Sequence, residues 1–387
     1  MATISSDRIL NDDLIVEILS WLPVTSLGRF RCVSKTWKFL ISNTCFVKLH
    51  LERSSRNPQL LLMLIKEHEK QCFIASFFSV SSLIQNPVST FRDSLDHSPN
   101  RRRILFGSCN GLLCTHDSVS TDESEEHWVN FWNPVTKISS RSSPSLRLSY
   151  DTGFPYHNNF EYNTDFLHRK NFGFGYDDRR DCYKVVIILF HTGQRRTSVW
   201  IYCMGDVCWR RTMINYSTFH SFDSNGHSLN GTVNWLGFSS EESRMKLRIL
   251  SYDLHNDTCR YLSVPELLCK ELSANSIGVL NGCLCFSHCG KTDFDVLVLK
   301  DVRDETSWTH LLSVSYKSLQ IKEHNSNLRI LCMSGDLLLL TYSKMGYRDF
   351  IVFNLKDNKV ERIEGIFQLL LFNIFSFHYA PSLISPI

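Results

Sequence analysis

The residues best suited to covalent chemistry are the cysteines, and Cys109 stands in the most suggestive setting. Residues 107–111 read Gly-Ser-Cys-Asn-Gly, the shape of a nucleophile on a sharp turn. A nucleophile elbow is followed by a helix, whereas the Leu-Leu-Cys that comes next here predicts a strand. Similar segments downstream carry Leu229, Leu280 and Met333 at the corresponding position. We therefore predict an ordinary β-hairpin and no catalytic thiol.

Two other segments have the composition of ligand sites. Residues 283–289 concentrate three cysteines and a histidine, but structural zinc sites use ligand pairs separated by two intervening residues with a matching distant pair, and this spacing is missing. Alternation with Leu284 and Phe286 instead predicts buried thiols on a strand. The Gly-x-Gly of residues 172–177 lacks the third glycine of a dinucleotide cradle. We expect no metal, no cofactor and no catalytic residue, and hence a protein that is not an enzyme.

Composition and charge exclude several classes of partner. The formal net charge of +3 over 387 residues gives no electrostatic case for nucleic-acid binding. The most apolar stretch, residues 366–377, is shorter than the roughly 20 residues of a membrane span and predicts one or two buried strands. Fourteen cysteines without a secretory signal are expected to be reduced thiols in the cytosol or nucleus.

The first fifty residues have helical periodicity. Helices would therefore position any groups near the N-terminus that bind a partner. One predicted helix carries its apolar residues on a single face: Leu14, Ile15, Ile18, Leu19 and Leu22. Asn11 can cap this helix and Pro23 ends it. Further helices are predicted over residues 25–33 and after the N-cap Ser34. So few short helices cannot bury their apolar surface alone, and we expect them to share their core with a partner.

From residue 60 onward the hydrophobic period is two, which predicts strands. An apolar run, a tight glycine turn and a second apolar run recur four times, over residues 104–114, 227–235, 277–286 and 328–338. Second turns follow at 132–136, 252–257 and 353–358, and residues 172–211 offer one further unit. Four strands in about 50 residues is typical of a kelch-like propeller blade. Five or six such units fit, and a two-sheet β-sandwich remains the alternative because it shares the hairpin chemistry.

The helical segment resembles a known family. Residues 10–24 read Leu-Asn-Asp-Asp-Leu-Ile-Val-Glu-Ile-Leu-Ser-Trp-Leu-Pro-Val, and residues 29–37 read Arg-Phe-Arg-Cys-Val-Ser-Lys-Thr-Trp. Together with Phe-Val-Lys-Leu at 46–49, this segment closely resembles the F-box. The remaining chain is similar to the plant F-box-associated, kelch-like region through residues 107–114, 132–134, 172–177 with 181–186, 230–235 and 379–383.

These observations together predict an α+β, multidomain chain. We expect a small helical F-box over residues 4–50 and a connecting segment with the first strands over residues 51–103. An all-β, kelch-like, β-propeller-type domain that binds substrate is expected over residues 104–387.

The resemblance implies a subunit of an SCF-type ubiquitin ligase. Its F-box would dock a Skp-family linker protein, and through it the cullin and RING subunits, while the β domain would hold an unidentified protein substrate. Carried over to this chain, the docking or docking-support residues are Leu10, Leu14, Ile18, Leu22, Pro23, Val24, Leu27, Cys32, Val33 and Trp37. Alternatives are a Skp-binding F-box protein that acts outside a ligase, and a propeller-like ligand-binding protein or enzyme.

Two positions depart from the family pattern. Asn11 stands where the family usually has proline, and Gly28 stands where leucine is common. Glycine inside a helix is unfavourable by about 1 kcal/mol. We therefore predict that Skp docking is present but weakened. The substrate-binding residues are unknown, and the long aromatic stretch of residues 150–171 is the candidate loop.

Overall fold

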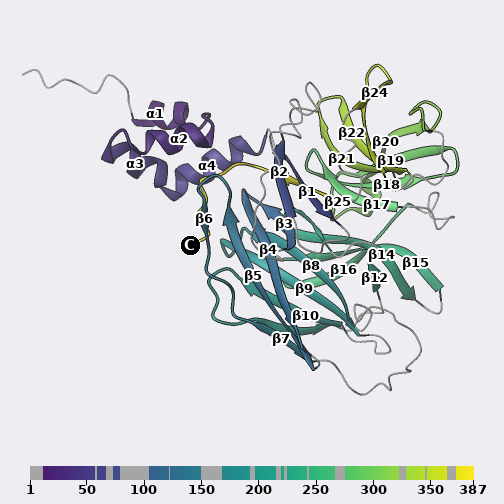
Figure 1. Cartoon of the computed structure of the whole chain (residues 1–387), viewed down its shortest axis with the longest axis horizontal. Helices are drawn as coiled ribbons and strands as arrows, with labels where there is room; N and C mark the ends of the chain where they lie inside the picture. The colour runs from purple at the N-terminus through teal and green to yellow at the C-terminus, as the bar shows by residue number, and fades with distance from the viewer. Residues whose placement is uncertain are drawn as a thin grey trace, which may run out of the picture.

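The protein consists of a small helical module and a larger ring of β-sheets (Figure 1). The computed structural model describes residues 12–56, 59–66, 73–78, 104–121, 123–149, 168–191, 197–214, 219–221, 225–241, 244–265, 275–321, 328–344, 347–363 and 372–387. Among these residues no helix has both the length and the apolar character needed to cross a bilayer.

Four helices form the N-terminal module, which we call the helical module: α1 (Asp12–Leu19), α2 (Val24–Phe30), α3 (Lys35–Ser42) and α4 (Thr44–Ser54). The predicted cap at Ser34 is confirmed, because its side chain accepts a hydrogen bond from the backbone N–H of Trp37 at 3.1 Å. Asn43 caps α4 in the same way, through the N–H of Cys45 at 2.8 Å. Leu10 and the predicted cap Asn11 lie outside the described residues.

The described strands make six sheets, which we number as blades in chain order. Blade 1 contains β3 (Ile104–Cys109), β4 (Leu112–Ser120), β5 (Ser124–Asn133), β6 (Ile138–Ser139) and β7 (Leu146–Ser149). Blade 2 contains β8 (His168–Asp177), β9 (Cys182–His191), β10 (Thr197–Cys203) and β11 (Arg210–Ile214). Blade 3 contains β12 (Phe219–Ser221), β13 (His227–Leu229), β14 (Thr232–Glu241), β15 (Arg244–Asp253) and β16 (Thr258–Ser263).

The other three sheets use the C-terminal part of the chain and the segment after the helices. Blade 4 contains β17 (Asn275–Leu280), β18 (Cys283–Cys289), β19 (Asp293–Leu299) and β20 (Trp308–Ser315). Blade 5 contains β21 (Arg329–Ser334), β22 (Leu337–Lys344), β23 (Tyr347–Asn354) and β24 (Lys359–Ile363). The sixth sheet, which we call the closing blade, contains β25 (Phe372–Tyr379), β1 (Gln59–Lys66) and β2 (Phe73–Phe78).

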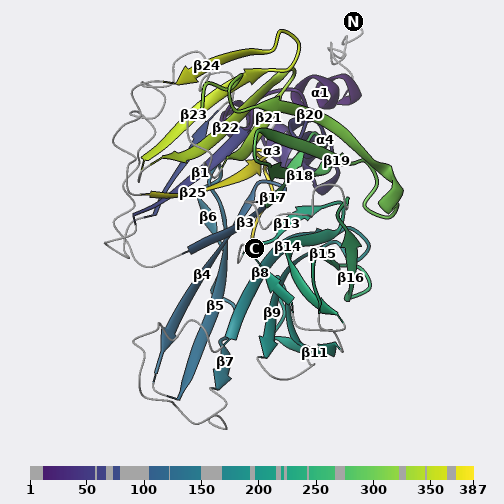
Figure 2. The same ribbon diagram turned by 90° about the vertical axis from the view of Figure 1, so that its right-hand side faces the viewer.

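The six sheets stand around a common axis as a β-propeller (Figure 2). Neighbouring blades touch through their innermost strands, in the closed order β3, β8, β13, β17, β21, β25 and back to β3. All pairings within the sheets are antiparallel, and blades 2, 4 and 5 each have four strands. The propeller prediction is thus confirmed, and the two-sheet sandwich is wrong, because the strands lie in six small sheets. The further unit predicted at residues 172–211 corresponds to blade 2, whose described residues are 168–191 and 197–214.

The repeated glycine turns join the two innermost strands of four blades. Asn110, Asn230 and Asn281 have φ angles of 51°, 46° and 46°, and the glycine after each also has positive φ. Both central residues in the left-handed region define a type I′ turn. The fourth turn differs, because only Gly335 (φ 57°) has positive φ, which is typical of type II′.

The closing blade joins the two ends of the propeller chain. Strand β1 pairs with β25 along its whole length, from Gln59 opposite Tyr379 to Lys66 opposite Phe372. Part of the segment predicted to be a connector therefore contributes two strands to the ring, while the exact domain boundary stays a prediction. The predicted strand at residues 366–377 corresponds to β25 from Phe372 on, and residues 366–371 lie outside the described part of the chain.

Apolar layers between the blades hold the ring together. Phe131 and Phe174 pack between blades 1 and 2, and Trp235 packs between blades 2 and 3. Gly173 permits this last contact, since a Cβ atom there would lie 2.8 Å from the Trp235 ring. The Gly-x-Gly segment therefore lies within β8, and its glycines serve close packing between sheets.

Candidate functional site

The helical module has its own apolar core, and two residues from the propeller complete it. Leu19, Val24, Leu27, Ile41 and Phe46 are all at most 4% exposed and pack together. Leu383, from the C-terminal tail, is buried in the same cluster, and Val135, from the β5–β6 turn, packs against it. The first fifty residues were expected to need a partner to complete their core. Leu383 and Val135 of the same chain complete part of it.

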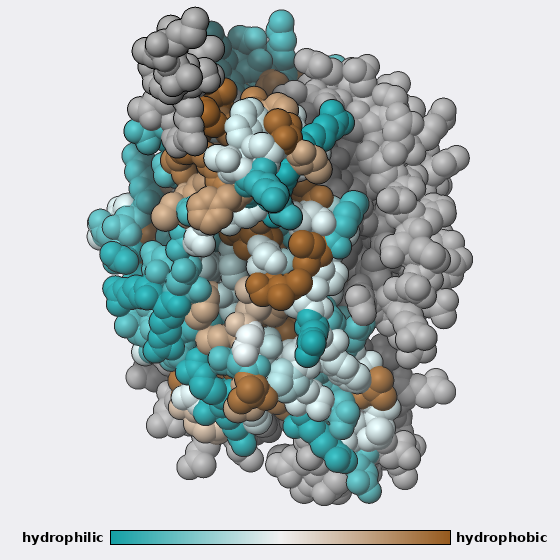
Figure 3. All heavy atoms as spheres, turned by 90° about the vertical axis from the view of Figure 1, so that its left-hand side faces the viewer, coloured by the Kyte–Doolittle hydropathy of each residue, from teal (hydrophilic) through white to brown (hydrophobic). Residues whose placement is uncertain are grey.

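Large apolar side chains nevertheless remain exposed on the helical module, and we call them the apolar face. Its members are Leu14 (53% exposed), Ile18 (54%), Trp21 (57%), Val33 (63%) and Phe39 (75%). Leu14 and Ile18 are four residues apart and form a stripe along α1, and Trp21 follows just after the helix ends at Leu19. Figure 3 shows apolar and polar side chains side by side on the flank of the molecule that carries the helices.

The structure divides the predicted docking residues into three groups. Leu14, Ile18, Pro23, Cys32 and Val33 are exposed, Leu22 and Trp37 are half-buried, and Val24 and Leu27 are buried in the core. Leu10 lies outside the described residues. Trp37 packs edge-on against Phe30 with ring centroids 5.4 Å apart, so part of its surface supports the fold. The docking role of the whole set stays a prediction.

Trp21 and Phe39 belong to the apolar face but were not among the predicted docking residues. Phe39 lies off the face that Trp37, Leu40 and Ile41 define on α3, and an aromatic residue on the polar side of a helix is the signal that would have found it. Trp21 follows the last turn of α1, where the next residues break the helical period. Its ring lies under the guanidinium of Arg53 at 4.6 Å.

Arg53 fixes α1 against α4 behind this face. It forms an ion pair with Glu17 at 2.6 Å and donates hydrogen bonds to the Glu17 carbonyl and to the Ser20 hydroxyl. A hydrogen bond from Arg53 lowers the pKa of Glu17, and a weaker contribution in the same direction comes from the hydrogen bond that Trp21 donates. The stripe on α1 is thus held in a defined orientation.

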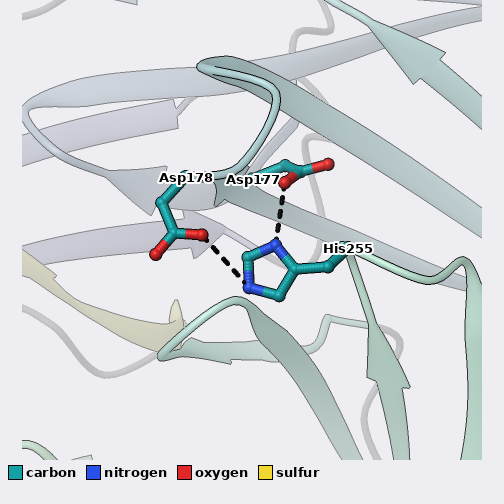
Figure 4. A group of neighbouring side chains, drawn as sticks. All are labelled: Asp177, Asp178 and His255. Carbon is teal, nitrogen blue, oxygen red and sulfur yellow. Dashed lines mark hydrogen bonds and ion pairs between the residues drawn. The ribbon is translucent and has the colours of Figure 1, made fainter.

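The propeller contains a separate cluster of ionisable residues between blades 2 and 3 (Figure 4). Nδ1 of His255 lies 2.8 Å from Oδ1 of Asp177, and its Nε2 lies 3.3 Å from Oδ1 of Asp178. The fully buried Lys184 bridges the other oxygen of Asp177 (2.9 Å) and Oδ1 of Asp257 (3.0 Å).

Asp177, Asp178 and His255 could offer one ligand atom each to a metal ion. Their ligand atoms already have partners within the protein. Burial raises the pKa of Asp177, yet hydrogen bonds from His255 and Lys184 outweigh burial and lower it to about 2. The carboxylate is therefore charged at neutral pH and neutralised by Lys184. We interpret Asp177, Asp178, Lys184, His255 and Asp257 as a set of ion pairs that joins blades 2 and 3, and we call it the inter-blade ion cluster.

A second buried polar chain lies on the side of blade 1 that faces blade 2. Nε2 of His127 donates to Glu125 at 3.1 Å, so its Nδ1 accepts a hydrogen bond from Nε2 of His116 at 2.8 Å. Glu125 also pairs with Lys170 of β8. Burial lowers the pKa of His116 to about 3 and that of His127 to about 4. Both rings are therefore neutral at pH 7.

The cysteines singled out in the sequence have structural surroundings. Cys109 ends β3 immediately before the Asn110–Gly111 turn, as predicted, and burial raises the pKa of its thiol to about 12. Such a thiol is protonated at neutral pH and is a poor nucleophile. On β18, Cys285 packs between blades 4 and 5 while Leu284 and Phe286 pack between blades 3 and 4. The predicted alternation is confirmed.

Comparison with known proteins identifies the class. The F-box domain family matches residues 9–49, and the F-box associated beta propeller domain family matches residues 62–386. Because the second match spans most of the chain, the chain belongs to the F-box proteins that carry an F-box associated β-propeller.

Individual relatives agree with this family. An F-box/kelch-repeat protein of Arabidopsis thaliana is 31% identical over 314 residues, which cover 78% of each chain. Another F-box protein of that plant is 29% identical over 268 residues, covering 66% of this chain and 59% of the relative.

Solved structures are similar only at a coarse level. A six-bladed fucose-binding lectin from Aleuria aurantia aligns with 8% identity and a TM-score of 0.33, covering 68% of this chain and 81% of the lectin. The propeller domain of a Pyrococcus furiosus protease gives 7% identity and a TM-score of 0.34, covering 67% and 84%. With such low scores, the propeller assignment rests on the six sheets and on the family match.

Proposed function

We propose that the protein is the substrate-recognition adaptor of an SCF-type ubiquitin ligase. The apolar face of the helical module would dock a Skp-family linker protein, and the propeller would hold a protein substrate. The adaptor itself would make no bonds. It would raise the effective concentration of a substrate lysine near the ubiquitin-charged enzyme that the ligase carries. The cytosol or nucleus is the compartment in which we propose that it acts.

The apolar face is the observation that carries this proposal. The helical module already has a closed core, yet five of its large apolar side chains are more than half exposed. Exposed apolar groups gathered on one small module are typical of a protein-binding surface.

Binding of a purified Skp-family linker protein, measured by calorimetry, tests the docking step. We expect the double variant Leu14→Asp, Ile18→Asp to lose at least about tenfold in affinity, because two charges replace apolar groups in the interface. Met245→Asp is the matched control, since Met245 is equally exposed (57%) but lies on blade 3. Equal affinities for all three proteins would refute the proposed docking face.

The exposed positions give a cleaner test than Trp37. Trp37 contacts Phe30 within the module, so replacing it would disturb the fold as well as the surface. The charge substitutions at Leu14 and Ile18 leave the buried core intact, and circular dichroism of each variant verifies this.

The ligase role is tested by capture from plant cells under proteasome inhibition, comparing the wild type with the double variant. A substrate is a protein that both forms retain and that accumulates in cells expressing the variant. Retained partners whose abundance never changes would instead indicate a Skp-binding protein that acts outside a ligase. The stretch of residues 150–171 remains our candidate for substrate contact. Its residues 150–167 lie outside the described part of the chain.

A further inference from the structure

The last residues of the chain leave the closing blade and return to the helical module (Figure 1). We call residues 380–387 the tail. Its Leu383 is 8% exposed and lies in the same apolar cluster as Leu19, Val24 and Leu27. A side chain from the far end of the chain therefore forms part of the helical core.

Hydrogen bonds hold the tail against both parts of the protein. The side-chain amide of Asn133, in blade 1, is fully buried and donates to the carbonyls of Ser382 (3.0 Å) and Ile384 (2.7 Å). The Ser382 hydroxyl donates to the Asn110 carbonyl at 2.7 Å. On the helical side, the Ser54 hydroxyl at the end of α4 donates to the Pro381 carbonyl at 2.8 Å.

The tail is packed as closely as a core segment where it crosses blade 1. A Cβ atom on Gly111 would lie 2.6 Å from the Ala380 carbonyl oxygen and within 2.7 Å of the Ser382 side chain. No other residue type fits there without moving the tail, and the positive φ of 80° also favours glycine. The turn glycine of blade 1 thus has a second role, as the seat of the tail.

The helical module is consequently attached to the propeller at two places. The chain passes from α4 into β1, whose first residue, Gln59, pairs with Tyr379 just before the tail begins. Ser55 and Arg56 follow α4 on the way to β1. They line the same hollow, of about 750 Å³, as Tyr379 and Ala380. A single connection of this kind would permit rotation, whereas two attachments with an apolar anchor between them oppose it.

We propose that the tail is a strap that fixes the helical module and the propeller as one rigid body, so that a bound substrate faces the ligase scaffold in one orientation. This inference rests on the proposed function for its biological meaning, but the rigidity is a property of the chain alone. Holding two modules in a fixed geometry avoids the loss of effective concentration that a flexible joint causes. Leu383 and Asn133 are the positioning residues of this strap.

The distance between the two parts tests the strap without a partner. Genetically encoded spin labels at Lys38 on α3 and Met245 on β15, both exposed, report the distribution of distances in the full chain. We expect a narrow distribution for the wild type and a clearly broader one for Leu383→Asp. Ile387→Asp is the matched control, because Ile387 lies in the same tail but is 89% exposed. Equally narrow distributions in all three proteins would overturn the proposal.

Ser382→Ala is a milder second variant, since it removes the hydrogen bond to Asn110 and keeps Leu383 in place. It is expected to broaden the distribution less than Leu383→Asp. If Leu383→Asp does not fold, as judged by circular dichroism, Ser382→Ala and Leu383→Ala carry the test, and unchanged distributions in both would refute the strap.

The functional readout is self-ubiquitination in a reconstituted ligase, with the modified lysines mapped by mass spectrometry. A rigid adaptor presents few propeller lysines to the charged enzyme, so we expect a confined pattern for the wild type and for Ile387→Asp. Ser382→Ala, which leaves the helical core intact, is expected to spread the modification over more lysines while Skp affinity stays within about twofold. An identical pattern in both variants would contradict the strap, whereas a wild type that does not bind Skp would instead refute the proposed function.

Discussion

The helical module and the propeller distribute their polar and apolar groups in opposite ways. The helical module exposes Leu14, Ile18 and Phe39 although its own core is closed. The propeller buries Lys184 and Asp177 completely, although charged groups favour water. The buried charges are satisfied by one another, while the exposed apolar groups have no such counterpart among the described residues. The difference teaches that the buried charges of the propeller are matched within the chain, whereas the exposed apolar groups of the helical module are the ones for which we propose a partner.

The largest expected effect concerns the buried charges. Lys184→Met removes the buried cation between Asp177 and Asp257 and leaves the half-exposed Arg180 as the cation near both. Removing one member of a buried ion pair destabilises a protein by about 3–5 kcal/mol. The free energy of unfolding in urea measures this. Lys48→Met is the matched control, because the Lys48–Asp181 pair is more than half exposed on both sides and is expected to contribute at most about 1 kcal/mol. Equal losses of stability in the two variants would show that the inter-blade ion cluster does not stabilise the propeller.

A second prediction separates core from surface within the helical module. Leu27 is fully buried, so Leu27→Ala is expected to reduce stability by about 2–5 kcal/mol. Phe39 is 75% exposed, so Phe39→Ala is expected to change stability by less than about 0.5 kcal/mol while weakening Skp binding. Thermal unfolding and calorimetric binding measure the two properties. If the Phe39→Ala variant binds the linker with full affinity, Phe39 is not part of the docking surface.

A third prediction follows from the neutral histidines inside the propeller. Burial lowers the pKa of His116 to about 3 and that of His127 to about 4. In the unfolded chain both have a pKa near 6.5, so the unfolded state binds more protons as pH falls below that value. Stability is therefore full above pH 6.5 and declines toward pH 4, by up to about 2.7 kcal/mol per pH unit for the two rings. A flat urea-unfolding profile over this range would contradict their neutral burial.

The smallest expected effect concerns Gly28 in α2. A Cβ atom there would meet no other atom within 4 Å. Gly28→Ala should therefore stabilise the helical module by about 1 kcal/mol, through helix propensity alone. Gly28→Leu adds exposed apolar area and should tighten Skp binding, which calorimetry measures. If leucine leaves the affinity unchanged, the departure from the family pattern at this position has no bearing on docking.

The sequence allowed the local elements to be predicted well, because their signals are local. Asn-Gly pairs at 110, 230 and 281 specify hairpins through backbone conformation, and Ser34 specifies a helix start through one hydrogen bond. The closed ring of six blades and the position of the first two strands were not predictable in this way. They depend on Gln59 pairing with Tyr379 across the length of the chain, which no periodicity encodes.

The candidate docking site was predictable only in part for a related reason. Helical spacing identifies apolar positions, but it does not say which of them face the core. Val24 and Leu27 are buried in the helical core, alongside Leu383 from the tail, which no analysis of the first fifty residues includes. Phe39 is exposed because the core is already filled without it. The division depends on residues far away in sequence.

The pairing of β1 with β25 has a consequence for biosynthesis. Strand β1 leaves the ribosome long before its partner β25, because almost the whole propeller lies between them in the sequence. Until then an apolar strand edge has no neighbour, and such long-range pairing folds slowly and favours aggregation. A chain truncated before residue 372 would therefore lack both the partner strand and the tail, so this truncation would affect the N-terminal helices as well.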